Sequence, residues 1–244
     1  MPMIKRMRKL SISRLPDCTA VIAAAGTSKR MGNVDKLFFE INGKPVLAHT
    51  LAAFQNSELI NEIIVVVREE MLERAGELCK KYDVGKVSKI VVGGERRIDS
   101  VTNGVYAASK KSSLIAIHDG ARPCLTDEVI ERAVKAAARH HAAAPGVAVS
   151  STIKRVSNGI VLETVDRSDL FEIQTPQVFS AELIKAALKS VSRKSIDLTD
   201  DCAAVELLGA AVYITEGARS NIKITENEDI QLAEKILSGL QAKA

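Results

Sequence analysis

Short apolar runs alternate with helical patterns along most of this chain, and this alternation is the feature that most constrains its fold. Buried strands are predicted at residues 19–25, 62–67, 89–92 and 114–118, and helices at 44–57, 71–82, 99–109 and 126–141. Strands and helices that alternate at this spacing form βαβ units with a mostly parallel sheet. We therefore predict an α/β protein with a Rossmann-like, mostly parallel, twisted sheet and helices on both faces.

Residues 151–172 break this rhythm. Two β-rich runs flank Ser157-Asn-Gly, and Asn-Gly between such runs is a strong hairpin signal. A hairpin between βαβ units has no obvious place in the sheet, so we expect it to project as an arm. The predicted organisation is a flexible N-terminal extension over 1–17 and a single domain over 18–244 that carries the arm.

Composition excludes several classes of partner. Aromatic residues make up only 3% of the chain and Trp is absent, so stacking surfaces for single-stranded nucleic acid would be hard to build. The net charge of +4 is small and suits an anionic small molecule. No apolar run approaches the length of about 20 residues that a membrane helix needs. We expect no nucleic acid polymer and no membrane as partners.

The cysteines and the N-terminus indicate a compartment. The four cysteines are far apart and form no CxxC pair, which favours a reduced, cytoplasmic setting. The first sixteen residues carry five basic groups and no acid. We expect a cytoplasmic protein, or a plastid one if this basic stretch is the remnant of a transit peptide.

Ligands of such sheets bind beyond the carboxyl ends of the strands, and three segments of this chain follow those ends. The first is Ala24-Ala-Gly-Thr-Ser-Lys-Arg-Met-Gly, followed by Lys36. A glycine turn after a strand can direct backbone N–H groups at a phosphate chain, and Lys29, Arg30 and Lys36 add positive charge. The spacing matches neither a Walker A loop nor GxGxxG. The alternative is a plain strand-to-helix turn with solvated basic residues.

The second segment is Gly93-Gly-Glu-Arg-Arg-Ile-Asp-Ser-Val. Paired glycines at a strand end let the backbone approach a flat ligand closely, and Ser100 could read a base edge. The alternative is a turn that Asp99 or Ser100 caps.

The third segment is His118-Asp-Gly-Ala-Arg-Pro. Asp119 could hold a ribose hydroxyl or a metal-bound water, and Arg122 could clamp a phosphate. His118 should point to the opposite face of the strand, into the core. A site rich in Arg and Lys and poor in acid–base candidates is typical of phosphoryl or nucleotidyl transfer.

Seven motifs occur in order over residues 19–237: Ala24-Ala-Gly…Lys29-Arg-Met-Gly…Lys36, Gly93-Gly-Glu-Arg-Arg-Ile-Asp-Ser-Val, His118-Asp-Gly-Ala-Arg-Pro, Thr164-Val-Asp-Arg, Gln174-Thr-Pro-Gln, Leu198-Thr-Asp-Asp and Asn221-Ile-Lys-Ile-Thr. Together they resemble the 2-C-methyl-D-erythritol 4-phosphate cytidylyltransferase family of the non-mevalonate isoprenoid pathway. Each motif is weak alone, but the ordered set is specific.

The resemblance implies that CTP and methylerythritol phosphate give 4-diphosphocytidyl-2-C-methyl-D-erythritol and pyrophosphate, with Mg²⁺ held mainly through the CTP phosphates. It implies a homodimer whose exchanged arms complete each other's sites. The residues it implicates are Arg30, Lys36, Arg167 and Lys223 in catalysis; Ala24, Ala25, Gly26, Gly94, Glu95, Ser100 and Asp119 in CTP binding; and Arg122, Thr152 and Thr175 in binding the sugar phosphate.

Other interpretations stay open at this point. The ribitol-5-phosphate cytidylyltransferase branch shares most of these motifs. Many relatives have proline before Lys36, where this chain has Asp35; an Asp-Lys pair there also occurs in relatives that transfer guanylate to the molybdenum cofactor. A non-catalytic nucleotide-binding domain is a further alternative. A nicotinamide dehydrogenase fits least, because the glycine fingerprint is missing.

Overall fold

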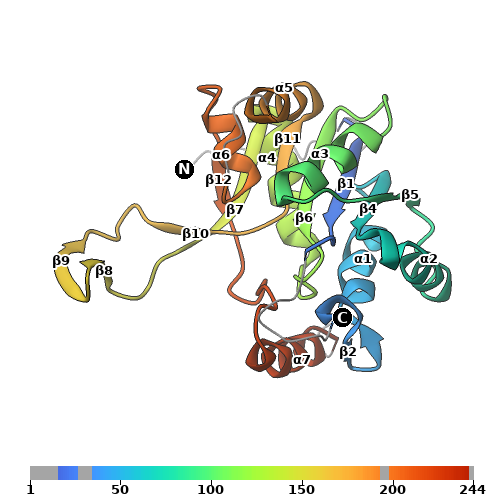
Figure 1. Cartoon of the computed structure of the whole chain (residues 1–244), viewed down its shortest axis with the longest axis horizontal. Helices are drawn as coiled ribbons and strands as arrows, with labels where there is room; N and C mark the ends of the chain where they lie inside the picture. The colour runs from blue at the N-terminus through green and yellow to red at the C-terminus, as the bar shows by residue number, and fades with distance from the viewer. Residues whose placement is uncertain (1–15, 27–34, 193–197, 242–244) are drawn as a thin grey trace, which may run out of the picture.

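The computed structural model describes residues 16–26, 35–192 and 198–241 (Figure 1). The expected N-terminal extension lies almost wholly outside the described residues, as does Arg30. Within them, no helix combines the length and apolar character needed to cross a bilayer.

Eight of the described strands form one sheet in the order β10-β7-β11-β6-β1-β4-β5, with β12 added beside β7. These strands are β1 (Cys18–Ala23), β4 (Glu62–Val67), β5 (Val87–Val92), β6 (Leu114–Asp119), β7 (Ala142–Ala148), β10 (Phe171–Ile173), β11 (Gln177–Ser180) and β12 (Tyr213–Glu216).

The half of the sheet around β1 is parallel. Val21 of β1 lies between Ile64 of β4 and Ile117 of β6 in register, and β4 continues the parallel order to β5. Strands β1, β4 and β6 are apolar runs that are buried on both faces, as parallel strands under helices usually are. The four predicted strands are confirmed, with ends that differ by one or two residues.

The other half of the sheet is mixed. Strand β11 runs antiparallel to both β6 and β7, β10 runs antiparallel to β7, and β12 runs parallel to β7. The sequence pattern predicted none of these strands. The sheet is therefore mostly parallel at its centre and mixed beyond β6.

Helices cover both faces of the sheet. The described helices are α1 (Val46–Asn56), α2 (Leu72–Lys81), α3 (Arg97–Ala107), α4 (Asp127–His140), α5 (Ala181–Ser192), α6 (Asp201–Glu206) and α7 (Asn227–Gln241). One core cluster joins α1, α2 and α4 to one face, and a second joins α3, α5 and α6 to the other. The predicted fold class is confirmed.

Helix α1 begins later than predicted. Residues Lys44–Pro45 form the short strand β3, which pairs with β2 (Glu40–Ile41). Pro45 therefore precedes the helix instead of lying in its first turn, because its extended backbone serves the small hairpin. Helix α7 packs near this hairpin and shares a small apolar cluster with Ile41 and Val46.

The predicted hairpin is confirmed. Among the described strands, β8 (Ile153–Ser157) and β9 (Ile160–Val165) pair only with each other, and Asn158 and Gly159 between them have φ of 49° and 78°. Positive φ at both central residues belongs to the tight turn that suits the twist of a hairpin. Figure 1 shows this arm extending away from the body of the protein. Its apolar side chains Val156, Ile160 and Leu162 are more than half exposed.

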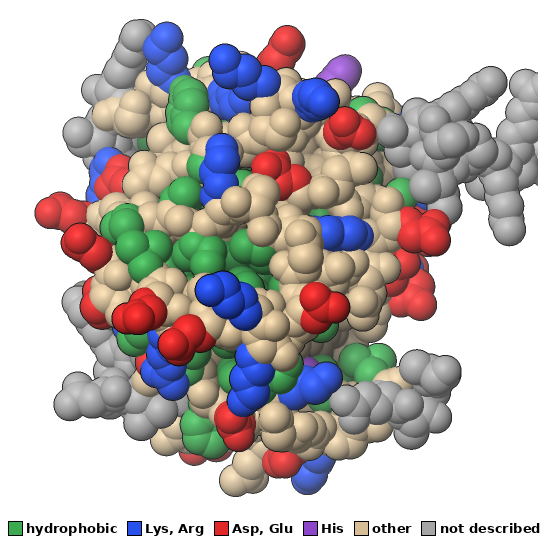
Figure 2. Space-filling model, turned by 90° about the vertical axis from the view of Figure 1, so that its right-hand side faces the viewer, with side chains coloured by type: hydrophobic (Ala, Val, Ile, Leu, Met, Phe, Trp, Pro, Cys, Tyr) green, Lys and Arg blue, Asp and Glu red, His purple; other side chains and the backbone are tan. Residues whose placement is uncertain are grey.

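Strand β5 forms the edge of the sheet opposite the arm. Figure 2 looks onto this side of the molecule, where Lys and Arg side chains alternate with Asp and Glu around a stretch of hydrophobic ones. Charges near an edge strand oppose its pairing with another sheet.

Candidate active site

A cavity of about 470 Å³ lies beyond the carboxyl ends of β1, β4 and β6, a place where open α/β sheets bind ligands. Its size is in the range of small-molecule sites. The residues that line it are Ala23, Ala24, Ala25, Gly26, Lys36, Leu37, Arg68, Gly94, Glu95, Arg96, Arg97, Ser100, Asp119, Ala121 and Lys223. The structure thus brings together residues from all three predicted loops.

The glycine turn after β5 forms one wall of the cavity. A Cβ atom on Gly93 would lie 2.5 Å from Cβ of Ala25 and 2.7 Å from Oγ of Ser100, so only glycine lets the two loops pack this closely. The backbone N–H of Gly94 donates to Oγ of Ser100 at 3.0 Å. Gly94 and Ser100 both line the cavity.

Three cations surround the carboxylate of Asp119 at the end of β6. Nζ of Lys223 lies 2.9 Å from its Oδ2, Nε of Arg122 lies 3.4 Å from the same atom, and Nη2 of Arg97 lies 3.7 Å from Oδ1. Burial alone would raise the pKa of this carboxyl, but the charges of Lys223, Arg97 and Arg122 outweigh burial and hold the pKa well below its usual range. Asp119 therefore stays ionised and fixes the cations around it.

Arg97 links the cavity to α6. Its two terminal nitrogens donate to both carboxylate oxygens of Asp201 at 2.9 and 2.8 Å. Asp201 is only 2% exposed, and its backbone N–H donates to the side chain of Gln177. No role for Arg97 was predicted from the sequence, because its partner Asp201 lies far away along the chain.

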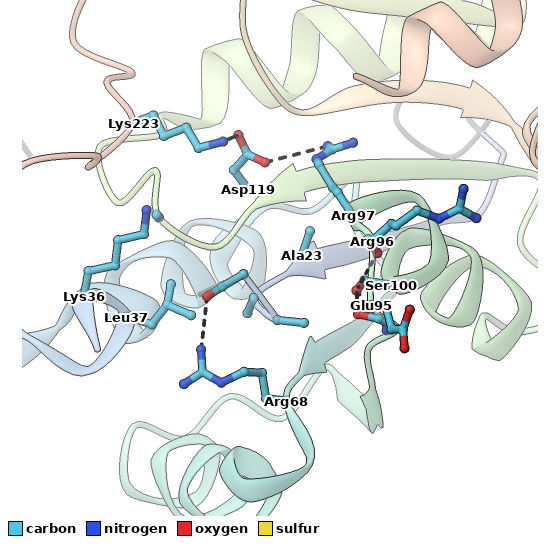
Figure 3. A pocket seen from close by; sticks show the side chains of 15 residues that line it. Ala23, Lys36, Leu37, Arg68, Glu95, Arg96, Arg97, Ser100, Asp119 and Lys223 are labelled. Atoms are coloured by element: carbon cyan, nitrogen blue, oxygen red, sulfur yellow. Dashed lines mark hydrogen bonds and ion pairs between the residues drawn. The ribbon is translucent and has the colours of Figure 1, made fainter. Parts of the chain in front are cut away.

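Lys36 lies on the side of the cavity opposite Ser100 and Glu95 (Figure 3). It begins the 3-10 turn η3 (Lys36–Phe38), and Leu37 and Phe38 anchor this turn in the core. Nζ of Lys36 donates to the backbone oxygen of Ile224 at 2.9 Å, near Lys223. The amino group is thereby held between the first loop and the segment that precedes α7.

His118 lies behind the cavity wall, as predicted from its position in β6. It is fully buried, and burial foremost lowers its pKa from 6.5 to about 3. Oγ1 of Thr175 contacts Nδ1 of His118 at 2.9 Å and accepts the backbone N–H of Asp119 at 3.2 Å. Thr175 therefore supports Asp119 from behind and does not line the cavity. A neutral, enclosed imidazole is unsuited to proton transfer with a substrate.

Of the predicted residues that the structure describes, Arg122, Arg167 and Thr152 also lie outside this cavity. Arg122 donates to the backbone oxygen of Asn221 at 2.7 Å and lines an adjacent hollow of about 330 Å³, which Lys223 also borders. Arg167 and Thr152 belong to the arm segment, where both are exposed. Arg167 donates to the backbone oxygen of Ser150. Within one chain, these two residues are not brought to the cavity.

The fold and this cavity define a class. An α/β sheet carries at its carboxyl edge a glycine-walled cleft, several fixed cations and the buried, ionised carboxylate of Asp119, while the neighbouring imidazole is buried and neutral. This arrangement is that of a nucleotidyltransferase, in which positioning and charge stabilisation do the chemistry. The profile of the 2-C-methyl-D-erythritol 4-phosphate cytidylyltransferase family matches residues 18–239. The chain belongs to this family, and the resemblance stated from the motifs is confirmed.

Individual relatives agree with the family match. A 2-C-methyl-D-erythritol 4-phosphate cytidylyltransferase from Halalkalibacterium halodurans is 43% identical over 221 residues, which cover 90% of this chain and 96% of the relative. A relative of the same name from Dehalococcoides mccartyi is 46% identical over 219 residues, which cover 89% and 95%.

Solved structures agree with the family match as well. The 4-diphosphocytidyl-2C-methyl-D-erythritol synthase from Anaerococcus prevotii aligns with a TM-score of 0.81 at 31% identity, covering 91% of this chain and 96% of that one. The 2-C-methyl-D-erythritol 4-phosphate cytidylyltransferase from Thermus thermophilus aligns with a TM-score of 0.76 at 30% identity, covering 90% and 98%.

Proposed function

We propose that this chain joins CTP and 2-C-methyl-D-erythritol 4-phosphate to give 4-diphosphocytidyl-2-C-methyl-D-erythritol and pyrophosphate, a step of isoprenoid precursor synthesis. The observation that carries the proposal is one cavity in which a glycine wall faces the cations Lys36 and Lys223 (Figure 3). Membership of the cytidylyltransferase family supplies the identity of the two substrates.

The reaction needs little acid–base chemistry. A phosphate oxygen of methylerythritol phosphate attacks the α-phosphorus of CTP, and the bond from that phosphorus to the leaving pyrophosphate oxygen breaks. The nucleophile is already an anion, so no residue must remove its proton. Catalysis then rests on alignment of the two substrates and on neutralising the charge that grows at the α-phosphorus.

Different cations of the site serve the two substrates. Lys36 lies on the wall next to the first loop, where its ammonium can face the α-phosphate, and the family resemblance gives Arg30 the same role. Lys223 and Arg122 border the adjacent hollow and are both held by Asp119, which places them to receive the acceptor phosphate. Two anionic substrates can therefore meet between fixed positive charges.

The backbone around Ala24, Ala25 and Gly94 forms the base pocket in this proposal. Fixed N–H and C=O groups that match the amino edge of cytosine would leave buried groups unpaired with uracil. Each such mismatch costs about 1–3 kcal/mol. CTP should therefore be preferred over UTP.

We propose that Mg²⁺ arrives with the nucleotide, held mainly through the CTP phosphates and water. Among the described residues, no three His, Cys, Asp or Glu side chains are grouped as a metal site. The carboxylate of Asp119 faces three cations. This residue set fits a metal whose ligands come chiefly from the triphosphate. When bound, the ion would offset phosphate charge and orient the triphosphate.

We propose a homodimer with exchanged arms. An isolated two-stranded hairpin is marginal in water, and the arm formed by β8 and β9 exposes Val156, Ile160 and Leu162. A two-fold dimer would cover these side chains with the same surface of a second copy. It would also give Thr152 and Arg167, which are exposed in one chain, a cavity to enter on the partner.

We place the enzyme in the cytoplasm. All four cysteines are free thiols, and burial raises the pKa of Cys124 to about 12. Unpaired, buried thiols are typical of proteins from reducing compartments. The alternative plastid location depends on the basic N-terminus, which lies outside the described residues.

One experiment tests the proposed reaction. The protein is incubated with Mg²⁺, each of the four nucleoside triphosphates, and either methylerythritol phosphate or ribitol 5-phosphate, and pyrophosphate release is measured. We expect release with CTP and methylerythritol phosphate. Comparable turnover with GTP or ATP, or faster turnover with ribitol 5-phosphate, would contradict the proposal. Omission of Mg²⁺ tests the metal requirement in the same assay.

A further inference from the structure

Arg68 uses all three nitrogens of its guanidinium to hold protein groups at the edge of the cavity. It follows β4 directly and lines the cavity. Nη1 donates to the backbone oxygen of Gly26 at 3.1 Å, Nη2 donates to Oδ2 of Asp35 at 2.8 Å, and Nε donates to Oε1 of Glu70 at 2.6 Å. Figure 3 shows the bond that joins Arg68 to the first loop.

Two of these partners flank the first loop. Gly26 follows β1, and Asp35 precedes Lys36; residues 27–34 lie between them in the sequence. One guanidinium therefore fixes both ends of this loop to the end of β4. A planar fork with several donors in fixed geometry can do this, whereas the single ammonium of a lysine cannot span two partners in the same way.

Asp35 transmits this restraint to Lys36. One carboxylate oxygen of Asp35 accepts the bond from Arg68, and the other accepts the backbone N–H of Leu37 at 3.2 Å. The second contact caps the turn that Lys36 begins. The side chain of Asp35 is 12% exposed, against 64% for Glu70, so water weakens the pairing with Glu70 far more.

The same contacts argue against a direct role for Arg68 on phosphate. Its positive charge faces two carboxylates, Asp35 and Glu70, so this cluster carries no excess positive charge to offer a triphosphate. Each of its nitrogens already donates to a protein oxygen. Lys36 also lines the cavity, and it begins the turn that Asp35 caps.

We propose that Arg68 is a positioning residue for the transfer reaction, which acts by clamping Gly26 and Asp35 and thereby setting the place of Lys36. This inference rests on the proposed function, because Lys36 is taken as the cation that faces the α-phosphate. A displacement of about 1 Å at a reacting centre can lower a rate by about 10²-fold. Loss of the clamp should thus lower kcat and leave the KM for methylerythritol phosphate almost unchanged.

A double-mutant cycle tests the clamp. The variants are Arg68→Gln, Asp35→Asn and the double variant; asparagine keeps the cap on Leu37 because it caps turns as well as aspartate does. We expect each single variant to lose about 10- to 100-fold in kcat, and the double variant to lose no more than either single one. Losses that multiply in the double variant would overturn the proposal, because they would show that Arg68 acts without Asp35.

Two further variants test whether Arg68 acts by clamping Gly26 and Asp35 or through its charge alone. Glu70→Gln removes the exposed partner of the same guanidinium and should keep wild-type kcat. Arg68→Lys keeps the charge without the fork and should be nearly as impaired as Arg68→Gln. Full activity of Arg68→Lys would overturn the clamp and indicate a point charge acting on the substrate.

Hydrogen exchange without substrates gives a readout that does not depend on the reaction. Arg68→Gln should speed amide exchange at residues 24–26 and 36–38, and Glu70→Gln should not. If wild-type protein makes no pyrophosphate while this difference in exchange is seen, the proposed reaction fails and the clamp stands. If wild-type protein is active and exchange in Arg68→Gln equals that of wild type, the clamp is overturned.

Discussion

Nζ of Lys223 lies 2.9 Å from Oδ2 of Asp119, although the two residues are far apart along the chain. The same carboxylate also faces Arg97 and Arg122. A buried anion that holds several cations determines their positions as well as their charges. Asp119 is therefore expected to act through the cations that it arranges.

Replacing Asp119 by asparagine should lower kcat by about 10²-fold, because Lys223 and Arg122 lose the charge that fixes them near the acceptor phosphate. Steady-state kinetics with both substrates varied would measure the loss. Asp127→Asn makes the same charge change in the first turn of α4, away from the cavity, and should keep full activity. An Asp119→Asn enzyme as active as this control would contradict the assigned arrangement.

His118 should make folding stability depend on pH. Its pKa is lowered from 6.5 to about 3 in the folded protein, chiefly by burial, so the unfolded chain takes up the proton first as pH falls. Stability is therefore lost as pH falls from about 6.5 toward 3, by about 2 kcal/mol between pH 7 and pH 5. Urea unfolding of wild type and His118→Asn at both pH values tests this.

The variant provides the reference for that measurement. Asparagine is neutral at both pH values, so the wild-type protein should lose about 2 kcal/mol more than the variant over this interval. Equal losses would show that His118 takes up its proton in the folded state. The variant should also keep much more activity than Asp119→Asn, because the reaction moves no proton through the imidazole.

Two helical glycines should respond in opposite directions to alanine. A Cβ atom on Gly104 of α3 would lie 2.4 Å from Cγ1 of Val21 and 2.7 Å from Cγ2 of Val66. The nearest described atom to one on Gly76 of α2 would be Cδ1 of Ile90, at 3.9 Å. Overpacking a core costs about 1–3 kcal/mol. Alanine is favoured over glycine within a helix by about 1 kcal/mol.

Gly104→Ala should therefore lower the free energy of unfolding, and Gly76→Ala should raise it by up to about 1 kcal/mol. Chemical denaturation of both variants against wild type measures the two signs. A stabilised Gly104→Ala protein would mean that α3 can shift away from β1 and β4 at little cost.

The elements that the sequence predicted are those with a strong local signal. Strands β1, β4 and β6 are apolar runs with Val or Ile, and Asn158-Gly159 defines a hairpin by its turn alone. Strand β7 has the sequence AAAPGVA, in which Ala, Pro and Gly all disfavour a strand. Pairing with β10, β11 and β12 holds β7 in the extended conformation, and no local sequence pattern predicts this pairing.

The sequence likewise predicted only part of the site. The loops after β1, β5 and β6 could be predicted, because parallel strands bring their carboxyl ends to one edge. Arg68 and Arg97 could not, because their contacts with Asp35 and Asp201 join residues 33 and 104 positions apart. Such pairs are set by the packing of whole elements. The contacts of Arg122 with Asp119 and with the backbone oxygen of Asn221 could not be predicted either, and its role at a phosphate stays a prediction.

The arm should complete the site of the partner subunit. If each arm completes the site of the other subunit, a working site needs Lys36 from one chain and Arg167 from its partner. Lys36→Ala removes a cation aimed at transition-state charge and should lower kcat by about 10²-fold; Arg167→Ala should be comparably impaired.

The two variants are unfolded together, refolded and assayed, and subunit exchange is checked with a mass tag on one of them. Random pairing gives about half heterodimers, each with one intact site, so roughly a quarter of wild-type activity should return. If each arm serves its own subunit, every heterodimer lacks an intact site, and the mixture remains as inactive as its parents despite exchange.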